Sequence, residues 1–148
     1  MTPDQQRLRD ALAAVPERVA VAARTSATPP DNAPAPGEWS ARENVLHLVA
    51  VESEVWHPRL DALATDTFPH WPWVEPGPWS GPGDGTFESA LAVFAAARAG
   101  TIARLDALDP DGWAHQGRHD TFGVLDVAAL LRIALDHDED HLAQIGAA

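Results

Sequence analysis

Helical periodicity is the feature that most limits the folds open to this 148-residue chain. Apolar residues recur every three or four positions in three segments, and in a fourth segment they do so around an internal proline. No stretch alternates convincingly between apolar and polar residues, as a half-buried strand would. The pattern therefore predicts an all-α protein with a single domain over residues 1–148, a four-helix bundle whose connections are long and rich in Pro, Gly and Trp.

The expected ends of these helices follow from capping residues and prolines. The four helices are predicted over residues 3–24, from a cap at Ser40 through Leu63, from a cap at Thr86 to about residue 108, and from about residue 124 to 145. Pro16 is expected to kink or split the first helix, and Pro58 to bend the second. Ser40 and Glu43 have the spacing of a capping box, in which each side chain bonds to the backbone amide of the other. Gly146 is the expected stop of the last helix.

Two connections hold many of the prolines. Residues 25–38 cannot continue a helix and should form an extended surface strap. Residues 68–85 contain Trp71, Trp73 and Trp79 among Pro and Gly, and form a long loop. Such a loop can be a lid whose tryptophans wall a binding pocket, or a strap whose tryptophans cap the core, and both interpretations stay open.

The composition removes several kinds of chemistry. The chain has no Cys, and all ten of its Lys and Arg residues are Arg. Without Cys it can form neither a disulfide nor a thiolate nucleophile, and it cannot bind zinc through sulfur. Without Lys it has no Schiff-base amine. Any bound metal must therefore use His, Asp or Glu as ligands.

Charge and hydropathy limit the partners. The net charge of -12 repels phosphate backbones, so no nucleic-acid partner is expected. The longest apolar stretches, residues 19–23 and 91–97, are far shorter than the ~20 residues of a membrane helix. Residues 1–10 are polar and lack the apolar segment of a signal peptide. We therefore expect a cytoplasmic protein that does not contact membranes and acts on a small-molecule substrate.

A histidine pair marks the last predicted helix. His137 and His141 are four positions apart, and at about 100° per residue both continue the inward stripe that begins with Leu130 and Ala134. Two histidines at this spacing on one helical face can bind a single metal ion. Because acidic residues surround the pair, a solvated helix end is the alternative.

His47 is the best candidate for a third ligand. It lies at the border of the apolar face of the second helix, and bundles build metal sites from side chains on facing helices. A core or border histidine with no metal is the alternative, because spacing alone does not show that His47 faces His137 and His141.

These motifs together resemble the DinB/YfiT-like superfamily. The matching positions are residues 37–43, 47–48, 52, 113, 123 and 137–145. The resemblance spans nearly the whole chain and implies a four-helix bundle that binds a divalent metal, commonly Zn or Ni. It places the ligands at His47, His137 and His141, and it favours a homodimer.

Near the predicted ligands, one acidic residue of the family pattern is missing and two other acidic residues are present. Many relatives carry an acidic residue where this chain has Ala50, so a role for a carboxylate at that position does not carry over. Glu52 lies near the middle of the apolar face and needs a partner, which we expect to be Arg98 or Arg104. Asp138 is expected on a solvated helix surface, with a hydrogen bond to a ligand imidazole as the alternative.

Three neutral imidazoles leave a coordination position open, as in catalytic metal sites. A metal there lowers the pKa of a bound thiol or water and polarises carbonyls. The characterised relatives imply a metal-dependent transferase that adds a low-molecular-weight thiol, of the bacillithiol or mycothiol type, to a small electrophile during detoxification. A non-catalytic metal- or ligand-binding stress protein and a metal-dependent hydrolase are the alternatives.

Four further side chains are candidates for roles beside the metal. Arg59 and Arg118 are candidate anchors for an anionic thiol cofactor, with solvated surface arginine as the alternative for each. His57 and His119 are candidates for general acid or base, with surface histidine as the alternative.

Overall fold

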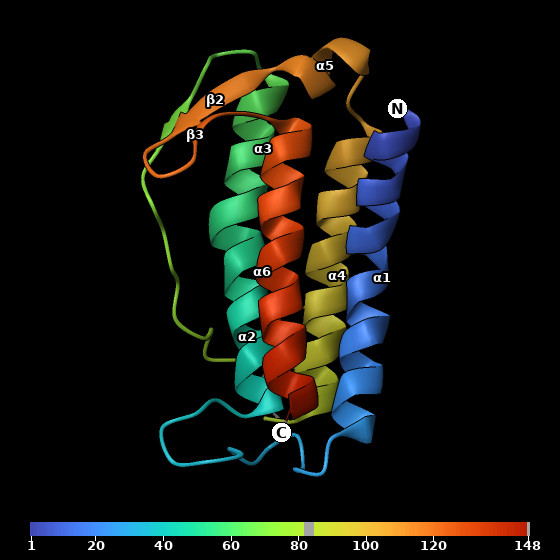
Figure 1. Ribbon diagram of the computed structural model, residues 1–148, viewed down its shortest axis with the longest axis vertical. Helices are drawn as coiled ribbons and strands as arrows, with labels where there is room; N and C mark the ends of the chain where they lie inside the picture. The colour runs from blue at the N-terminus through green and yellow to red at the C-terminus, as the bar shows by residue number, and fades with distance from the viewer. Residues whose placement is uncertain (82–84, 148) are drawn as a thin grey trace.

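The computed structural model describes residues 1–81 and 85–147 as a helical bundle (Figure 1). Its helices are α1 (Pro3–Thr25), α2 (Ala41–Val51), the π-helical turn η1 (Glu52–Trp56), α3 (His57–Ala64), α4 (Phe87–Asp106), α5 (Pro110–Ala114) and α6 (Val127–Ala147). Because α2, η1 and α3 form one continuous rod, the described residues make four long rods that pack side by side. The predicted all-α four-helix bundle is confirmed. None of the described helices is long and apolar enough to cross a membrane.

The order of the rods explains the long loop. In Figure 1, α3 ends and α4 begins at opposite ends of the bundle, so these two helices run in the same direction. The chain after α3 must therefore return along the outside of the bundle before α4 can start. This return carries residues 65–81 past the flank of α2 and α3.

The predicted break in the first helix is wrong, because α1 continues through Pro16 without interruption. Proline removes one backbone donor, whereas packing against neighbouring helices stabilises the whole length of a helix. Val15 and Val19, on either side of Pro16, are fully buried, and α1 packs against both α4 and α6. These tertiary contacts hold the helix together.

The predicted helix starts are confirmed at two caps. Ser40 Oγ accepts a hydrogen bond from the Glu43 amide, and the Glu43 side chain accepts one from the Ser40 amide. Thr86 Oγ1 accepts from the Ser89 amide. The π-helical turn η1 ends at Trp56, two positions before Pro58, which has no amide to donate to a carbonyl of the preceding turn.

A small sheet closes one end of the bundle, and the sequence did not predict it. Its strands are β1 (His70–Trp71), β2 (Gln116–His119) and β3 (Gly123–Asp126), with β1 parallel and β3 antiparallel to the central β2. Strands of two to four residues are too short to show alternation. A Cβ on Gly117 would lie 2.4 Å from the Trp71 ring, so glycine permits the close packing of β1 on β2.

Because β3 precedes it, the last helix starts later than predicted, and it also ends later. Residues 124–126 belong to β3, and Asp126 Oδ1 accepts from the Ala129 amide as the cap of α6. Gly146 lies inside α6 and does not stop it. A short helix that was not predicted, α5, follows α4, with Asp109 as its cap.

Two apolar clusters form the core, and buried polar residues lie between them. On α4, Phe94 belongs to one cluster and Leu105 to the other, with Arg98 and Thr101 between. On α6, Asp138 and His141 lie between Ala134 of one cluster and Leu142 of the other. On the α2–η1 rod, His47 lies among residues of one cluster and Glu52 among residues of the other. We call these buried polar residues the polar band: His47, Glu52, Arg98, Thr101, Asp138 and His141. A bundle that buries so many polar groups needs partners or ligands for each of them.

Candidate metal centre

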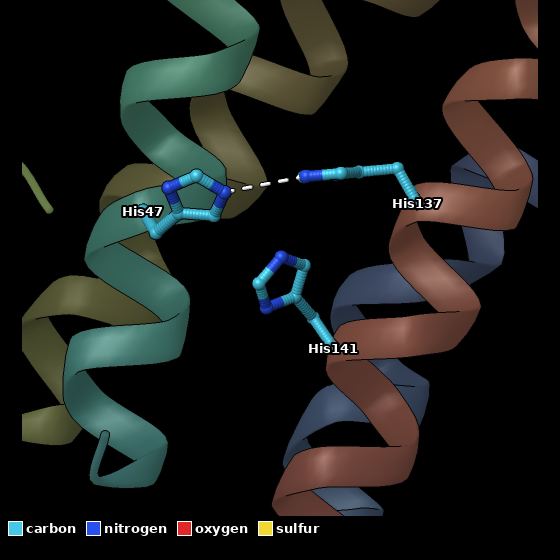
Figure 2. Close-up of side chains that lie close together, drawn as sticks. All are labelled: His47, His137 and His141. Atoms are coloured by element: carbon cyan, nitrogen blue, oxygen red, sulfur yellow. Dashed lines mark hydrogen bonds between the residues drawn. The ribbon is translucent and has the colours of Figure 1, made fainter. Parts of the chain in front are cut away.

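The structure brings His47, His137 and His141 together at this polar band. Figure 2 shows the rings converging, with His47 on α2 facing the other two on α6. One nitrogen from each ring lies within 4.8 Å of the other two. His47 is fully buried and His141 almost so, while His137 is partly exposed. The three histidines are therefore within reach of one ion, although binding of a metal stays a prediction.

The geometry of the nitrogens fits a metal ion. The Nε2 atoms of His47 and His137 are 3.2 Å apart. Two nitrogens at about 2.0–2.1 Å from one tetrahedral ion would be separated by roughly 3.3 Å. Three imidazoles and no thiolate make a donor set that suits Zn or Ni.

Asn44 sets the orientation of His141. Its Nδ2 donates to the Ser40 carbonyl at 3.0 Å, which leaves Oδ1 to accept from His141 Nδ1 at 2.7 Å. Because His141 Nδ1 carries the proton, Nε2 keeps its lone pair for a ligand. The capping box that starts α2 thus also holds the residue that orients a candidate ligand.

The electrostatics keep all three rings neutral. Burial lowers the pKa of His141 to about 3, with repulsion from His137 and His47 adding to the effect. Burial likewise lowers the pKa of His47, with His137 contributing, and burial lowers the pKa of His137. Neutral imidazoles are the form that binds metal, so protons compete weakly here near neutral pH.

Aromatic packing and two bare nitrogens complete the surroundings of the three histidines. The Trp39 ring stacks on His141 at 6.2 Å between centroids and tilts against His47 at 5.0 Å. The Nδ1 atoms of His47 and His137 are buried without a hydrogen-bond partner among the described residues. The polar atoms of these rings are thus incompletely satisfied by the chain itself.

Glu75 approaches the cluster from the returning loop. Its Oε1 is 3.4 Å from His47 Nε2 and 3.8 Å from His137 Nε2, and its side chain is half exposed. A carboxylate there can act as an oxygen ligand or as a base. The sequence carries no signal for this residue, because a single Glu in a Pro-rich loop has no periodicity that would place it.

A pocket of about 220 Å³ opens beside the cluster, and His137 and Glu75 line it. Most of its wall is apolar or aromatic, from Val51, Val55, Trp56, Trp73, Val74, Phe122 and Ile133. Its remaining polar side chains are Arg59, His119, Asp136 and Asp140. Of the three loop tryptophans only Trp73 is in this wall, since Trp71 belongs to the core and Trp79 is exposed.

Of the four other candidate residues, two line the pocket and two do not. Arg59 and His119 are 6% and 2% exposed and line the pocket, so the surface alternative is wrong for both. Arg118 is exposed on β2 and is not part of the pocket wall. His57 lies between α3 and α4, where its Nε2 bonds to the Ala97 carbonyl at 3.0 Å and to Thr101 Oγ1 at 2.9 Å.

The expected partner of Glu52 is confirmed, and the expectation for Asp138 is wrong. Arg98 pairs with Glu52 and also with Asp138, to whose Oδ1 its Nη2 donates at 3.0 Å. Asp138 is completely buried and bonds to no imidazole among the described hydrogen bonds. Arg104 pairs instead with the exposed Asp61. The acidic run on α6 suggested solvent exposure, but Asp138 is the member that turns inward.

Comparisons with known proteins agree with this fold. YfiT from Bacillus subtilis, described as a probable metal-dependent hydrolase with an unusual four-helix bundle topology, has a similar structure with a TM-score of 0.75. The two chains are 20% identical over 99% of this chain and 86% of YfiT. No curated protein matches the sequence. The profile of the DinB superfamily matches residues 4–145, and the chain therefore belongs to the DinB superfamily.

Proposed function

We propose that this protein is a metal-dependent enzyme that adds a low-molecular-weight thiol to a small electrophile. The observation that carries the proposal is the double position of His137, which belongs to the three-histidine cluster and to the wall of the adjoining pocket. A group bound at the metal would therefore face a molecule held in the pocket.

Different residues of the chain would hold the metal, orient its ligand and bind the electrophile. A divalent ion held by His47, His137 and His141 would lower the pKa of a thiol, which the Cys-free chain cannot supply itself. Asn44 holds the His141 ring in the tautomer that presents Nε2. The aromatic and aliphatic wall of the pocket suits an apolar electrophile and excludes water around it.

Thiol-dependent turnover tests this proposal. Zn- and Ni-loaded protein is incubated with 1-chloro-2,4-dinitrobenzene and, in turn, with bacillithiol, mycothiol and glutathione, and adduct formation is followed by absorbance. We expect saturable adduct formation with at least one thiol, and its loss in His137→Ala. Arg104→Met is the matched control, because Arg104 pairs with Asp61 away from the pocket. Metal-loaded protein that gives no rate above background with any thiol would overturn the proposal.

Hydrolysis is the second candidate function, and Glu75 favours it. A carboxylate 3.4 and 3.8 Å from two candidate ligand nitrogens would serve as a general base for a water molecule at this site if the histidines held an ion. YfiT, whose structure is similar, is described as a probable metal-dependent hydrolase. A hydrolase would cleave p-nitrophenyl esters without added thiol, and Glu75→Gln would lower that rate by about a hundredfold. Thiol transfer would tolerate this change better.

A binding protein without catalysis is the remaining alternative. It would bind metal and pocket ligands with normal stoichiometry and turn over neither the thiol nor the ester substrates.

A further inference from the structure

Arg59 is a buried cation for which the described part of the chain provides no counter-ion. It is 6% exposed, and no carboxylate of the described residues lies within 4.0 Å of its guanidinium. Its Nη2 donates to the Pro72 carbonyl at 3.0 Å, and its Cζ lies 5.8 Å from the Trp56 ring and 5.6 Å from the Trp71 ring. Burial accordingly lowers the pKa of Arg59.

The contrast with the other buried arginine is informative. Arg98 is buried to a similar degree and pairs with both Glu52 and Asp138. A guanidinium has five N–H donors, and a buried unpaired charge is costly. Arg59 lines the pocket, so an anionic ligand there would supply the missing partner.

His119 adds a second donor to the same pocket. Its Nδ1 accepts from the amides of Thr121 at 3.0 Å and Phe122 at 3.3 Å, so the proton of the neutral ring is on Nε2. Burial and the nearby charge of Arg59 both lower the pKa of His119 and keep this tautomer neutral. His119 is therefore set as a hydrogen-bond donor beside a cation.

The charges along the pocket are unequally placed. Glu75 is near the three histidines, Asp136 directly precedes His137 on α6, and the carboxylate of Asp140 acts on His137 from one turn along that helix. Arg59 and His119 form a group that has no described ion pair with any of these three acids. The ring of Trp56 neighbours both groups, since it lies 6.5 Å from the His137 ring and 5.8 Å from Arg59 Cζ. An anion is thus attracted toward Arg59 and repelled by the acids beside His137.

The size of the pocket limits the ligand. Its 220 Å³ is below the ~300–1,000 Å³ of pockets that hold drug-sized ligands. The body of the ligand would contact Val55, Trp56, Trp73, Phe122 and Ile133, which are apolar or aromatic.

We propose that the pocket selects small carboxylates with an apolar or aromatic body, and that Arg59 and His119 bind the carboxylate. The opposite end of such a ligand faces His137. The inference rests on the proposed function for what happens at that end, but carboxylate binding itself needs no metal.

The test compares a carboxylate with its neutral amide on chelator-treated, metal-free protein. The probes are 3-phenylpropanoate and 3-phenylpropanamide, and binding is followed by tryptophan fluorescence and by isothermal titration. We expect the carboxylate to bind tenfold or more tighter than the amide, because hydrogen bonds to a charged group are stronger than those between neutral groups. In Arg59→Gln this preference should disappear, and in Arg59→Lys part of it should remain.

Two control variants test whether carboxylate binding depends on the metal site or on surface charge. His47→Ala removes a candidate ligand that is not part of the pocket wall, and it should keep the carboxylate preference. Arg118→Gln makes the same charge change at an exposed position and should also keep it. Wild-type protein that binds both probes equally, or neither at millimolar concentration, overturns the inference even if Arg59→Gln fails to fold. Loss of thiol turnover alone leaves it standing.

Discussion

Two largely buried polar clusters share the α2–η1 rod and α6 but differ in how their groups are paired. The ion-pair cluster consists of Glu52, Arg98 and Asp138, and the histidine cluster consists of His47, His137 and His141. Both draw on the α2–η1 rod and on α6, where Asp138 follows His137 directly. In the ion-pair cluster each carboxylate pairs with Arg98, and Thr101 donates to Glu52. In the histidine cluster three neutral rings turn nitrogens toward one another.

The difference separates groups that are paired within the fold from groups that are candidates to bind a ligand. Arg98 also donates to the Leu12 carbonyl at 2.9 Å, so the ion-pair cluster ties α1 to the other three rods. The histidine cluster joins a pocket through His137 and keeps two Nδ1 atoms without partners among the described residues. Mutations in the two clusters should therefore change different measurable quantities.

The largest effect is expected from the histidines. Wild-type protein reconstituted with Zn or Ni should contain close to one ion per chain, by elemental analysis after desalting. His47→Ala, His137→Ala and His141→Ala should each weaken binding by more than the ~10–100-fold typical of a lost outer-shell partner. Their helicity by circular dichroism should stay the same. Metal-free wild type after reconstitution, or full metal content in all three variants, would contradict this prediction.

The second-largest effect is a loss of fold stability, which is expected from Arg98→Met. Removing the cation leaves two buried carboxylates without a partner, and the free energy of unfolding should fall by about 3–5 kcal/mol. Urea unfolding of the metal-free protein measures this change. The matched control is Arg104→Met, which breaks the more exposed pair with Asp61 and should cost less than about 1 kcal/mol. Equal costs for the two arginines would remove the distinction between buried and exposed pairs.

A smaller effect on metal affinity is expected from Asn44, which lies in the first turn of α2 and accepts a hydrogen bond from His141. Asn44→Ala removes the acceptor that orients His141, and metal affinity should fall by roughly 10–100-fold. Asn44→Asp keeps an acceptor for His141 Nδ1 and should restore most of the affinity. Titration with Zn against a competing chelator measures both variants. If Asp and Ala weaken binding equally, His141 does not depend on this hydrogen bond.

The smallest effect is expected from pH. The pKa of His141 is about 3 in the folded protein against 6.5 in an unperturbed chain. Below pH 6.5 the unfolded chain therefore binds a proton that the folded protein does not, and stability falls as the pH drops toward 3. Burial raises the pKa of Asp138 from 3.8 to about 6, which acts in the opposite direction over that range.

Four histidines have lowered pKa values, as do Asp106 and Glu139, and all of these oppose the single raised carboxyl group. A net loss of stability is therefore expected for the metal-free protein between pH 7 and pH 4. Urea midpoints across this range measure the slope. His141→Ala should have a shallower pH dependence than wild type, and an identical slope in both proteins would contradict the assignment.

Local features of the sequence were sufficient to predict the helices and some residues of the polar band. The Ser40–Glu43 box and the Thr86 cap are satisfied within one turn of chain, so their residues identify them directly. The spacing of His137 and His141 puts both on one face of any helix that contains them. Glu52 required a cation because carboxylates are costly to bury, and Arg98 provides it.

Tertiary structure decided what depends on packing between distant segments. The sheet at the end of the bundle, the inward turn of Asp138 and the continuity of α1 through Pro16 all result from contacts with other elements. The approach of Glu75 depends on the path of a loop that returns along the bundle.

Arg59 and His119 are 60 positions apart in the sequence and meet in one pocket only through the fold. Periodicity and capping act within a few residues of a given position, so the sequence by itself determined the helices and the histidine spacing. Which side chains share a cavity depends on how the rods and the returning loop pack, and only the tertiary structure decided that.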